Sequence, residues 1–305
     1  MTTRLRPFGI VGLLVATSAW GSLFLVGKPV LAHVDPVWFT FVRYTLASVG
    51  FALLLAARGA FPWDKLRAHA PRLALLGFVG YGVFSAMVLL GLMHSVPSHG
   101  AVIMATMPIT TQLVRWLLDG TRPAPTVVLG TALALAGVVV VSGVLLGHDG
   151  EDSTAAGDLI TLAGTLGWIG YTRGSAGLAS LDVLEYSGLT AIASWPLLLA
   201  SALAGAALGW TPLPSPQALE GSWHALLYIG VFPSVVAILA FNFGVRTLGV
   251  VTGTAFLNFV PVSALLMGTA LGTRPAPHEL LGVAMVIAAL LIHTLAQRRV
   301  TPAFA

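Results

Sequence analysis

Long apolar segments separated by short polar connections make up most of the chain. A helix needs about 20 predominantly apolar residues to cross the hydrocarbon core of a bilayer. Ten segments reach or approach this length: 8–31, 36–57, 71–93, 97–118, 124–146, 158–179, 183–207, 222–247, 250–271 and 277–296. The pattern therefore predicts an all-α fold, a polytopic membrane protein with ten transmembrane helices.

The basic residues near the ends of these segments predict the orientation, because connections rich in Lys and Arg stay on the cytoplasmic side. With the N-terminus inside, the cytoplasmic ends and connections receive most of them: Arg4, Arg6, Arg58, Lys65, Arg67, Arg72, Arg115, Arg122, Arg246, Arg298 and Arg299. The external connections 147–158 and 209–221 contain neither Lys nor Arg. We therefore expect a multi-pass protein of the plasma or inner membrane with both termini in the cytoplasm.

The motif TRPAP occurs twice, at 121–125 and 273–277, and the copies lie 152 positions apart, half the length of the chain. A proline precedes each copy in its span, and a glycine and a further apolar run follow each. The predicted repeating unit holds five spans, so the second copy enters the membrane upside down. We expect a first repeat at 1–150 and a second, inverted repeat at 151–305, within one membrane domain. The inversion also explains why Arg274 falls in an external connection.

Inverted repeats of this kind are typical of secondary transporters, whose substrate site lies near the membrane midplane between the repeats. Pro108 and Pro261 lie in the spans that precede the two motifs. Proline is tolerated in membrane helices as a simple kink. In a transporter the same kink can shape a gate, and both interpretations of the two prolines stay open.

The composition supports a membrane protein and excludes several other classes. Apolar residues make up 57% of the chain and charged residues 9%, against about 45–50% and about 25% in soluble domains. The net charge of +4 comes from scattered basic residues rather than from one basic face, so we expect no nucleic-acid partner. The chain has no cysteine, which excludes disulfides and thiolate metal sites.

No catalytic or cofactor-binding motif in the sequence is complete. In GSLFLVGKP, at 21–29, five residues separate the glycines where a phosphate-binding loop requires four. HELLG, at 278–282, lacks the second histidine of a zinc-protease helix. We therefore expect no enzyme activity, no cofactor and no metal. The expected partners are a small-molecule substrate and the lipid bilayer, with no obligate protein partner.

The chain resembles the drug/metabolite transporter (DMT) superfamily, specifically its EamA-type ten-span exporters. The resemblance covers nearly the whole length and rests on four stretches: WGSLFLVGKPVL, DPVWFTFVRYTLA, SVPSHGAVIMATMPITTQLVRWLLDGTRPAP and TLGVVTGTAFLNFVPVSALLMGTALGTRPAP. One departure is Thr121 and Thr273, where the family commonly has an acidic residue. The resemblance implies export of small metabolites, often amino acids, or of amphiphilic drugs, without nucleotide hydrolysis.

Ionisable groups inside a membrane are costly and are candidates for function. All 11 acidic residues lie in connections or near the predicted span ends, which disfavours proton coupling through a buried carboxylate and strongly cationic substrates. The basic candidates are Lys28 near the outer end of the first span, Arg43 about 10 Å into the second, and Arg173 about 9 Å into the sixth, at 1.5 Å per residue. Each either reaches for the headgroups or pairs structurally, or attracts a substrate carboxylate.

The predicted midplane positions carry mainly aromatic or small polar side chains: Trp20, Tyr81, Phe84, Ser85, Met104, Thr111, Trp168, Tyr171, Phe241, Asn242, Phe256, Asn258 and Phe259. Trp and Tyr that face lipid prefer the membrane interfaces, so these residues either line a substrate cavity or pack between helices. Trp20 and Trp168 fall at corresponding places in the two repeats. His94 and His99 bracket an external turn, where they either titrate near neutral pH at a cavity mouth or are ordinary loop residues.

The function expected from these observations is a secondary transporter that exports small amphipathic metabolites, above all amino acids, by alternating access. Transport of sugar phosphates, nucleotide sugars or drugs stays open as an alternative, although doubly charged substrates favour several deep basic residues. An integral membrane enzyme needs a cluster of catalytic polar groups at one depth. A channel needs a ring of like residues around an axis.

Overall fold

The computed structural model of the chain describes residues 2–94, 103–104, 106–142, 155–272 and 274–300. Within these ranges the chain is helical, and no strand occurs. The helices are α1 (Thr2–Leu31), α2 (Pro36–Ala57), α3 (Trp63–Gly77), α4 (Phe84–Met93), α6 (Met107–Asp119), α7 (Pro125–Ser142), α8 (Ala155–Gly174), α9 (Val183–Ala207), α10 (Pro216–Val231), α11 (Ala237–Leu248), α12 (Val250–Phe256), α13 (Phe259–Ala270) and α14 (Pro277–Val300). Two π-helical segments, η1 (Phe78–Val83) and η4 (Phe232–Val236), and a 3₁₀ segment, η3 (Ser175–Leu178), join some of them.

The membrane-protein class is supported by helix length and composition. Six helical segments are long and apolar enough to cross a bilayer, namely 5–27, 36–57, 63–91, 183–207, 216–248 and 250–270. Two shorter apolar helices lie at 125–140 and 277–292. The count of ten spans stays a prediction, because the remaining predicted spans are shorter, less apolar or partly outside the described residues.

The helix bounds agree with the sequence prediction for α2 and α9, and they differ elsewhere for identifiable reasons. The third helix starts at Trp63 rather than 71, because its polar first turns continue the helix beyond the apolar segment. The eighth starts at Pro216 rather than 222, where the Ser215 side chain accepts a hydrogen bond from the amide of Ala218. α8 ends at Gly174 and gives way to a 3₁₀ turn, so the predicted span to 179 is too long.

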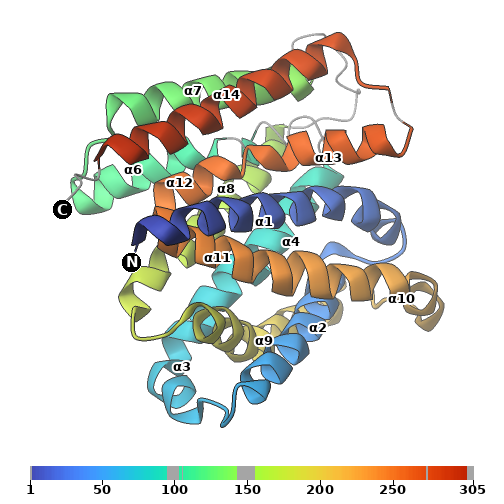
Figure 1. Cartoon of the computed structure of the whole chain (residues 1–305). Helices are drawn as coiled ribbons and strands as arrows, with labels where there is room; N and C mark the ends of the chain where they lie inside the picture. Colours follow the sequence, from blue (N-terminus) through green and yellow to red (C-terminus); the bar gives the residue numbers. More distant parts are fainter. Residues whose placement is uncertain (1, 95–102, 105, 143–154, 273, 301–305) are drawn as a thin grey trace.

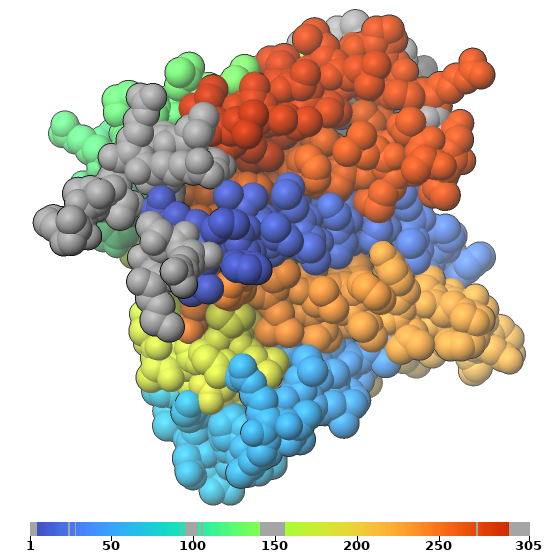
Figure 2. All heavy atoms as spheres, in the orientation of Figure 1, coloured from blue at the N-terminus to red at the C-terminus, as the bar shows by residue number. Residues whose placement is uncertain are grey.

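In Figure 1, α1, α7, α11, α13 and α14 run roughly along one direction, and α2, α3 and α9 are inclined to them. α7 and α14 lie side by side, and α1 lies between α11 and α13. Figure 2 shows the same order on the surface, with α1 flanked by the second-half helices on both sides. Because α1 contacts helices from the far half of the sequence, the two halves of the chain intertwine rather than form two separate bundles.

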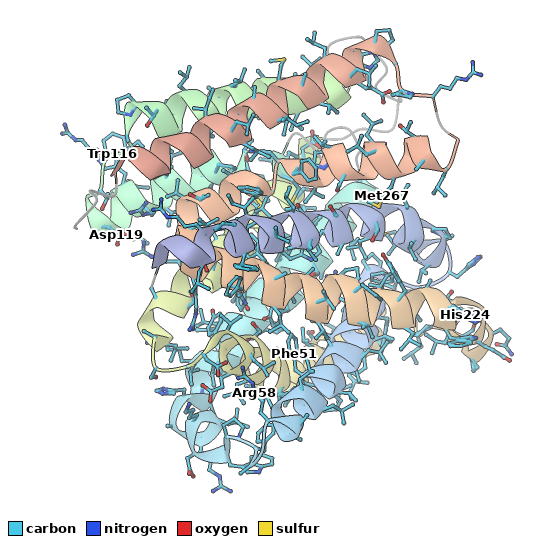
Figure 3. All side chains as sticks on the ribbon, viewed as in Figure 1. Phe51, Arg58, Trp116, Asp119, His224 and Met267 are labelled. Atoms are coloured by element: carbon cyan, nitrogen blue, oxygen red, sulfur yellow. The ribbon has the colours of Figure 1, made fainter. Side chains whose placement is uncertain are left out.

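The start of α1 and the end of α14 lie at the same end of the bundle (Figure 1). The connection between α6 and α7 lies at this end, and the connection between α13 and α14 lies at the opposite end. In Figure 3, Asp119 marks the first end and His224 the second. We refer below to the terminal end and the distal end of the bundle.

Irregular helix geometry recurs at matched places in the two halves. η1 begins at Phe78 and η4 begins 154 positions later at Phe232. α6 begins at Met107, and α13 begins 152 positions later at Phe259 after a break from α12. π-Helical turns are rare and often occur at functional sites. Both spacings lie within two positions of the 152-residue separation of the TRPAP motifs.

Candidate functional site

A small cavity of about 70 Å³ lies between α1, α2, α4, α6, α8 and the break between α12 and α13. Its walls come from both halves of the chain: Trp20, Leu23, Arg43, Tyr44, Phe84, Ser85, Val88, Leu89, Met104, Met107, Trp168, Leu257 and Val260. All of these side chains except those of Arg43 and Ser85 are apolar or aromatic. We call this space the central cavity.

Arg43 is the charged residue in the wall of the central cavity, and it is 5% exposed. Its Nε donates to the hydroxyl of Ser234 at 2.5 Å, and its Nη2 lies 3.5 Å from the carbonyl oxygen of Pro233. Its guanidinium also lies 4.9 Å from the ring centre of Tyr44. Among the described residues, no acidic side chain pairs with Arg43. The positive charge is therefore held by neutral groups and is not neutralised.

The π-helical segment η4 supplies these neutral groups because of its proline. Pro233 has no amide hydrogen, so a carbonyl in the preceding turn loses its usual donor. The hydroxyl of Ser234 donates to the carbonyl of Ile229 at 2.8 Å while it accepts from Arg43. The carbonyl of Pro233 accepts the indole N–H of Trp20 at 2.8 Å. One irregular turn thus orients both a cation and an aromatic ring of the cavity wall.

Aromatic rings surround the other side of the cavity. Trp168 contacts Trp20 with ring centroids 5.2 Å apart, Phe84 at 5.4 Å and Phe241 at 5.4 Å. The indole nitrogen of Trp168 is buried and has no hydrogen-bond partner. A buried Trp N–H normally finds a partner, so this group is a donor without an acceptor in the protein.

A fully buried polar network lies next to the cavity. The hydroxyl of Tyr81 donates to that of Tyr171 at 2.5 Å, and Asn242 donates to Tyr171 at 2.7 Å and to Ser187 at 2.8 Å. The ring of Tyr171 contacts that of Trp168 at 5.2 Å. Because its donors and acceptors satisfy one another, this network is suited to holding α8, α9 and α11 together beside the cavity.

A larger space of about 710 Å³ opens at the terminal end. Three arginines and one aspartate line it: Arg72, Arg115, Arg173 and Asp119. Arg173 forms a bidentate ion pair with Asp119, joining the ends of α8 and α6. The four charged residues that line this space carry a formal charge of +2 when Asp119 is ionised. We call this space the vestibule.

The vestibule and the central cavity lie on opposite sides of a thin packed layer. Ile169 lines the vestibule and its neighbour Trp168 lines the cavity. On α6, Thr111 lines the vestibule and Met107 the cavity, about 6 Å apart along the helix axis. A ligand moving from one space to the other therefore has to pass about one helical turn of packed side chains.

Each half of the sequence matches the EamA-like transporter family model, at residues 7–143 and again at residues 155–295. The chain belongs to the EamA-like transporter family. The family is one of membrane transporters, so the site just described is the interior of a transporter and not of an enzyme.

Several curated transporters are similar to this chain over most of both lengths. The uncharacterized transporter YrdR of Bacillus subtilis (strain 168) is 25% identical over 296 residues, covering 95% of this chain and 92% of the relative. The uncharacterized inner membrane transporter YedA of Escherichia coli (strain K12) is 29% identical over 283 residues, covering 90% and 87%. The "Probable terminal-alkyne amino-acid exporter" of Streptantibioticus cattleyicolor is 26% identical over 297 residues, covering 94% of each.

A solved crystal structure, described only as that of a protein, matches this transporter with a TM-score of 0.78. The match covers 98% of this chain and 99% of the other, at 23% sequence identity. At this identity the likeness shows that the two chains share their fold.

Six of the sequence-predicted site residues line the central cavity: Trp20, Arg43, Phe84, Ser85, Met104 and Trp168. Tyr81, Tyr171 and Asn242 instead form the buried network, and Phe241 packs on Trp20 and Trp168. Thr111 lines the vestibule, with a buried hydroxyl that has no partner.

The predicted residues of the ninth span lie outside the cavity wall. Phe256 and Asn258 are buried in the helix packing, and Phe259 is half-buried, whereas Leu257 and Val260 face the cavity. The amides of Leu257, Asn258 and Val260 bond to carbonyls three residues earlier, not four. This tight break between α12 and α13 rotates the side chains beyond it about the helix axis. The prediction assumed one uninterrupted helix and therefore placed these side chains on the wrong face.

The predicted prolines lie near the two matched helix starts. Pro108 is the second residue of α6 and is buried, and Pro261 is the third residue of α13 and is half-buried. A proline is easily accommodated in the first turn of a helix, where its missing amide hydrogen leaves no bond unmade. Both prolines therefore follow the breaks and do not kink continuous helices.

The three basic candidates differ in position. Arg43 lines the cavity as described. Arg173 lies one residue before the end of α8 and lines the vestibule. Its depth of about 9 Å at 1.5 Å per residue stays a prediction. The side chain of Lys28 lies outside the described residues. His94 is exposed at the end of α4, and His99 lies outside the described residues.

Sequence reasoning missed several parts of the site. Tyr44 follows Arg43 directly, and Met107 lies one helical turn after Met104, so both could have been found from spacing. Ser234 carried a weaker signal, a polar residue directly after a proline within an apolar segment. The vestibule arginines Arg72 and Arg115 were used only for orientation.

Proposed function

We propose that this chain is a secondary transporter that exports small amphipathic metabolites, above all amino acids, by alternating access. The observation that carries the proposal is the unneutralised charge of the buried Arg43 in the wall of a largely apolar cavity. A buried cation without an acidic partner is costly, and a substrate carboxylate compensates this cost. Two of the five guanidinium N–H donors are used, which leaves donors for a carboxylate.

The rest of the cavity wall suits the other end of such a substrate. The indole N–H of Trp168 is available to a second acceptor on the ligand. Phe84, Met104 and Met107 offer apolar and polarizable surface, and methionine adapts to side chains of different shape. A ligand with one carboxylate and one apolar group fits this division, as an apolar amino acid does.

The size of the cavity favours a closed state. About 70 Å³ is far below the roughly 300–1,000 Å³ of pockets that hold drug-sized ligands. Substrate entry therefore requires the lining helices to move apart. The breaks at Met107 and Phe259 and the π-helical segments supply places where the helices can bend.

The vestibule supports a route for anionic or zwitterionic substrates from the terminal end. Its net positive charge raises the local concentration of anions, because a cleft of one charge sign focuses the electric field. If the termini are cytoplasmic, as the positive-inside pattern predicts, the vestibule faces the cytoplasm. Substrate then passes from the cytoplasm to the central cavity and leaves at the distal end.

We also propose that the membrane domain consists of ten spans in two inverted five-span repeats. The double match of the family model, the matched helix irregularities and the opposite ends of the two TRPAP connections support this arrangement. Such repeats rock against each other about a fixed midplane site in transporters.

The similarity to a probable exporter of an amino acid supports the substrate class. Sugar phosphates fit less well, because one arginine lines the cavity, whereas a doubly charged phosphate favours several basic groups. The charge that Arg43 brings to the cavity wall is positive, which disfavours cationic drugs.

Counterflow in proteoliposomes tests the proposal. Liposomes loaded with unlabelled leucine, phenylalanine or tryptophan should accumulate the corresponding labelled amino acid, and accumulation should saturate with substrate. The decarboxylated amines should fail to compete. Counterflow driven by amines or by sugar phosphates, with none by amino acids, would refute the proposed substrate class. Liposomes without protein serve as the control.

A further inference from the structure

A second groove lies outside the proposed transport route, between α2, the η1–α4 segment and α9. Its volume is about 400 Å³, and it shares no lining residue with the central cavity or the vestibule. Along α9 it extends from Leu198 to Leu208, a length of about 15 Å at 1.5 Å per residue. This is half of the roughly 30 Å hydrocarbon core. The groove therefore has the depth of one membrane leaflet, at the distal end.

Small residues create the groove. Ala86 lies on one wall and Ala204 on the other, and Ala204 is exposed. Gly205 lets the chain beyond α9 fold back against the helix, since a Cβ at this position would lie 2.6 Å from the hydroxyl oxygen of Thr211. The lining residues carry no charge, so the groove is built for an apolar occupant.

Two hydroxyl groups in this apolar wall lack hydrogen-bond partners. Thr40 is 2% exposed and Thr211 is 9% exposed, both line the groove, and neither hydroxyl oxygen has a partner. Some other buried threonines donate to a carbonyl one turn back, as Thr17 does to Leu13 at 2.8 Å and Thr190 to Tyr186 at 2.6 Å, whereas Thr111, Thr161, Thr172 and Thr252 also lack a partner. Of the threonines in the described ranges whose hydroxyls lack a partner, Thr40 and Thr211 are the two that line this groove.

The two hydroxyls lie near the distal membrane surface. Thr40 is in the second turn of α2, which starts at Pro36. Thr211 follows α9 and is adjacent to Trp210, which is 76% exposed. Exposed tryptophans of membrane proteins concentrate at the interface with the headgroups. A ligand atom that accepts hydrogen bonds from these hydroxyls therefore lies at the boundary between headgroups and hydrocarbon, next to the apolar groove.

We propose that this groove binds one acyl chain of a phospholipid of the distal leaflet. The hydrocarbon chain lies along α9 between Ala86 and Ala204. The ester carbonyl oxygens accept hydrogen bonds from Thr40 and Thr211. The site is thus a lipid-binding site on the outside of the transporter, and it does not depend on which substrate the central cavity takes.

Native mass spectrometry of the purified protein, titrated with dioleoylphosphatidylglycerol, tests the site. Ala204→Phe fills the groove and should lower the affinity for the first bound lipid at least tenfold. Ala207→Phe is the matched control, because Ala207 is exposed on the same helix but does not line the groove. Equal lipid binding by wild type and Ala204→Phe, with both proteins folded, would overturn the proposal.

A comparison of ester and ether lipids tests the hydroxyls and does not rely on Ala204→Phe folding. Wild type should bind the diester lipid more tightly than its diether analogue with the same chains. Thr40→Val and Thr211→Val should each weaken diester binding about fivefold, the value of one neutral hydrogen bond, and leave diether binding unchanged. Equal affinity of wild type for both lipids would contradict the proposed bonds. A change of substrate KM in Ala204→Phe, with lipid binding intact, would instead make the groove a lateral substrate portal.

Discussion

Trp20 and Trp168 meet edge to face in the wall of the central cavity, with ring centroids 5.2 Å apart, although 148 residues separate them in the chain. Each comes from a different one of the two segments that match the family model. Their indole N–H groups differ, since that of Trp20 donates to the carbonyl of Pro233 and that of Trp168 has no partner. We infer from this difference that Trp20 has a structural role, and we propose that the indole N–H of Trp168 bonds to substrate.

Trp168→Phe should raise the KM for amino acids and lower the thermal stability less than Trp168→Ala does, because it leaves a smaller cavity. The substitution keeps an aromatic ring in the cavity wall and removes a donor that has no partner in the protein. Trp168→Ala removes the whole indole, and lost apolar contact of roughly 1–3 kcal/mol should raise KM about 5- to 150-fold. The measurements are the melting temperature in detergent and KM in proteoliposomes.

Trp20→Phe is the matched control for this experiment. It breaks the bond to Pro233 and leaves that buried carbonyl without a donor, so it should lower the melting temperature. Unchanged KM in Trp168→Phe and in Trp168→Ala, with only a loss of stability, would remove Trp168 from the substrate site.

The sequence predicted most helices well, because long apolar segments leave little choice of secondary structure. α2 and α9 have the predicted bounds, and the rings of Trp20 and Trp168, which the sequence predicted to share one lining, are in contact. Side-chain direction was harder to predict. The break before Phe259 turned Leu257 and Val260, rather than Asn258, toward the cavity, and only the i to i−3 bonds of the structure reveal it.

The sequence also did not predict which residues contact each other across long separations in the chain. Arg43 was a candidate on depth alone, but its contact with Ser234 joins residues 191 positions apart. No local pattern distinguishes an arginine held by neutral groups from one that reaches the headgroups. The same holds for Arg173, whose ion pair with Asp119 depends on where two separate helices end.

Arg43→Gln should raise the KM for amino acids about 10- to 150-fold, the value of a charge-assisted hydrogen bond of about 1.5–3 kcal/mol. The methyl esters of the same amino acids lack the anionic carboxylate, so their competition should hardly change. Arg43→Lys keeps the charge but loses the planar fork, and an intermediate KM is expected. A uniform loss of affinity for acids and esters would show that Arg43 only supports the packing.

The two TRPAP connections should be accessible from opposite sides of the membrane. Single cysteines at Ala124 and Ala276 can be placed in a chain that has no native cysteine. A membrane-impermeant maleimide should label Ala276→Cys in intact cells and Ala124→Cys only after permeabilisation. Labelling of both positions from the same side would refute the inverted repeat.

Thermal stability should be constant near neutral pH and fall below about pH 4. Arg173 lowers the pKa of Asp119 through their hydrogen bonds. Burial acts to raise the pKa of Asp182, but hydrogen bonds from the backbone of Glu185 and from Arg58 outweigh it and lower this pKa. A lowered carboxyl pKa stabilises the fold above its unfolded value, and this contribution is lost as pH falls through the folded pKa.

Asp182→Asn isolates the charge from the helix cap, because asparagine is an equally good N-cap residue. The variant should melt below wild type at pH 7, and the two melting temperatures should converge at pH 3. Asp64→Asn is the control, since Asp64 is exposed and has no ion-pair partner in the described part of the chain. Melting curves of Asp182→Asn and wild type that run parallel over pH 3–8 would contradict the assigned role of this charge.

Transport should persist without an imposed proton gradient, as exchange or facilitated diffusion. Every acidic residue in the described ranges lies in a connection or in the first or last turns of a helix, namely Asp35, Asp64, Asp119, Asp158, Asp182, Glu185, Glu220 and Glu279. A transporter that couples to protons through a carboxylate needs such a group at mid-depth, where burial brings its pKa near neutral. Leucine counterflow at equal pH inside and outside should therefore be the same with and without a protonophore. Strict dependence on a pH gradient, under conditions in which the substrate gradient is preserved, would show that the coupling group is not a mid-depth carboxylate of this kind and would direct attention to His94 and His99.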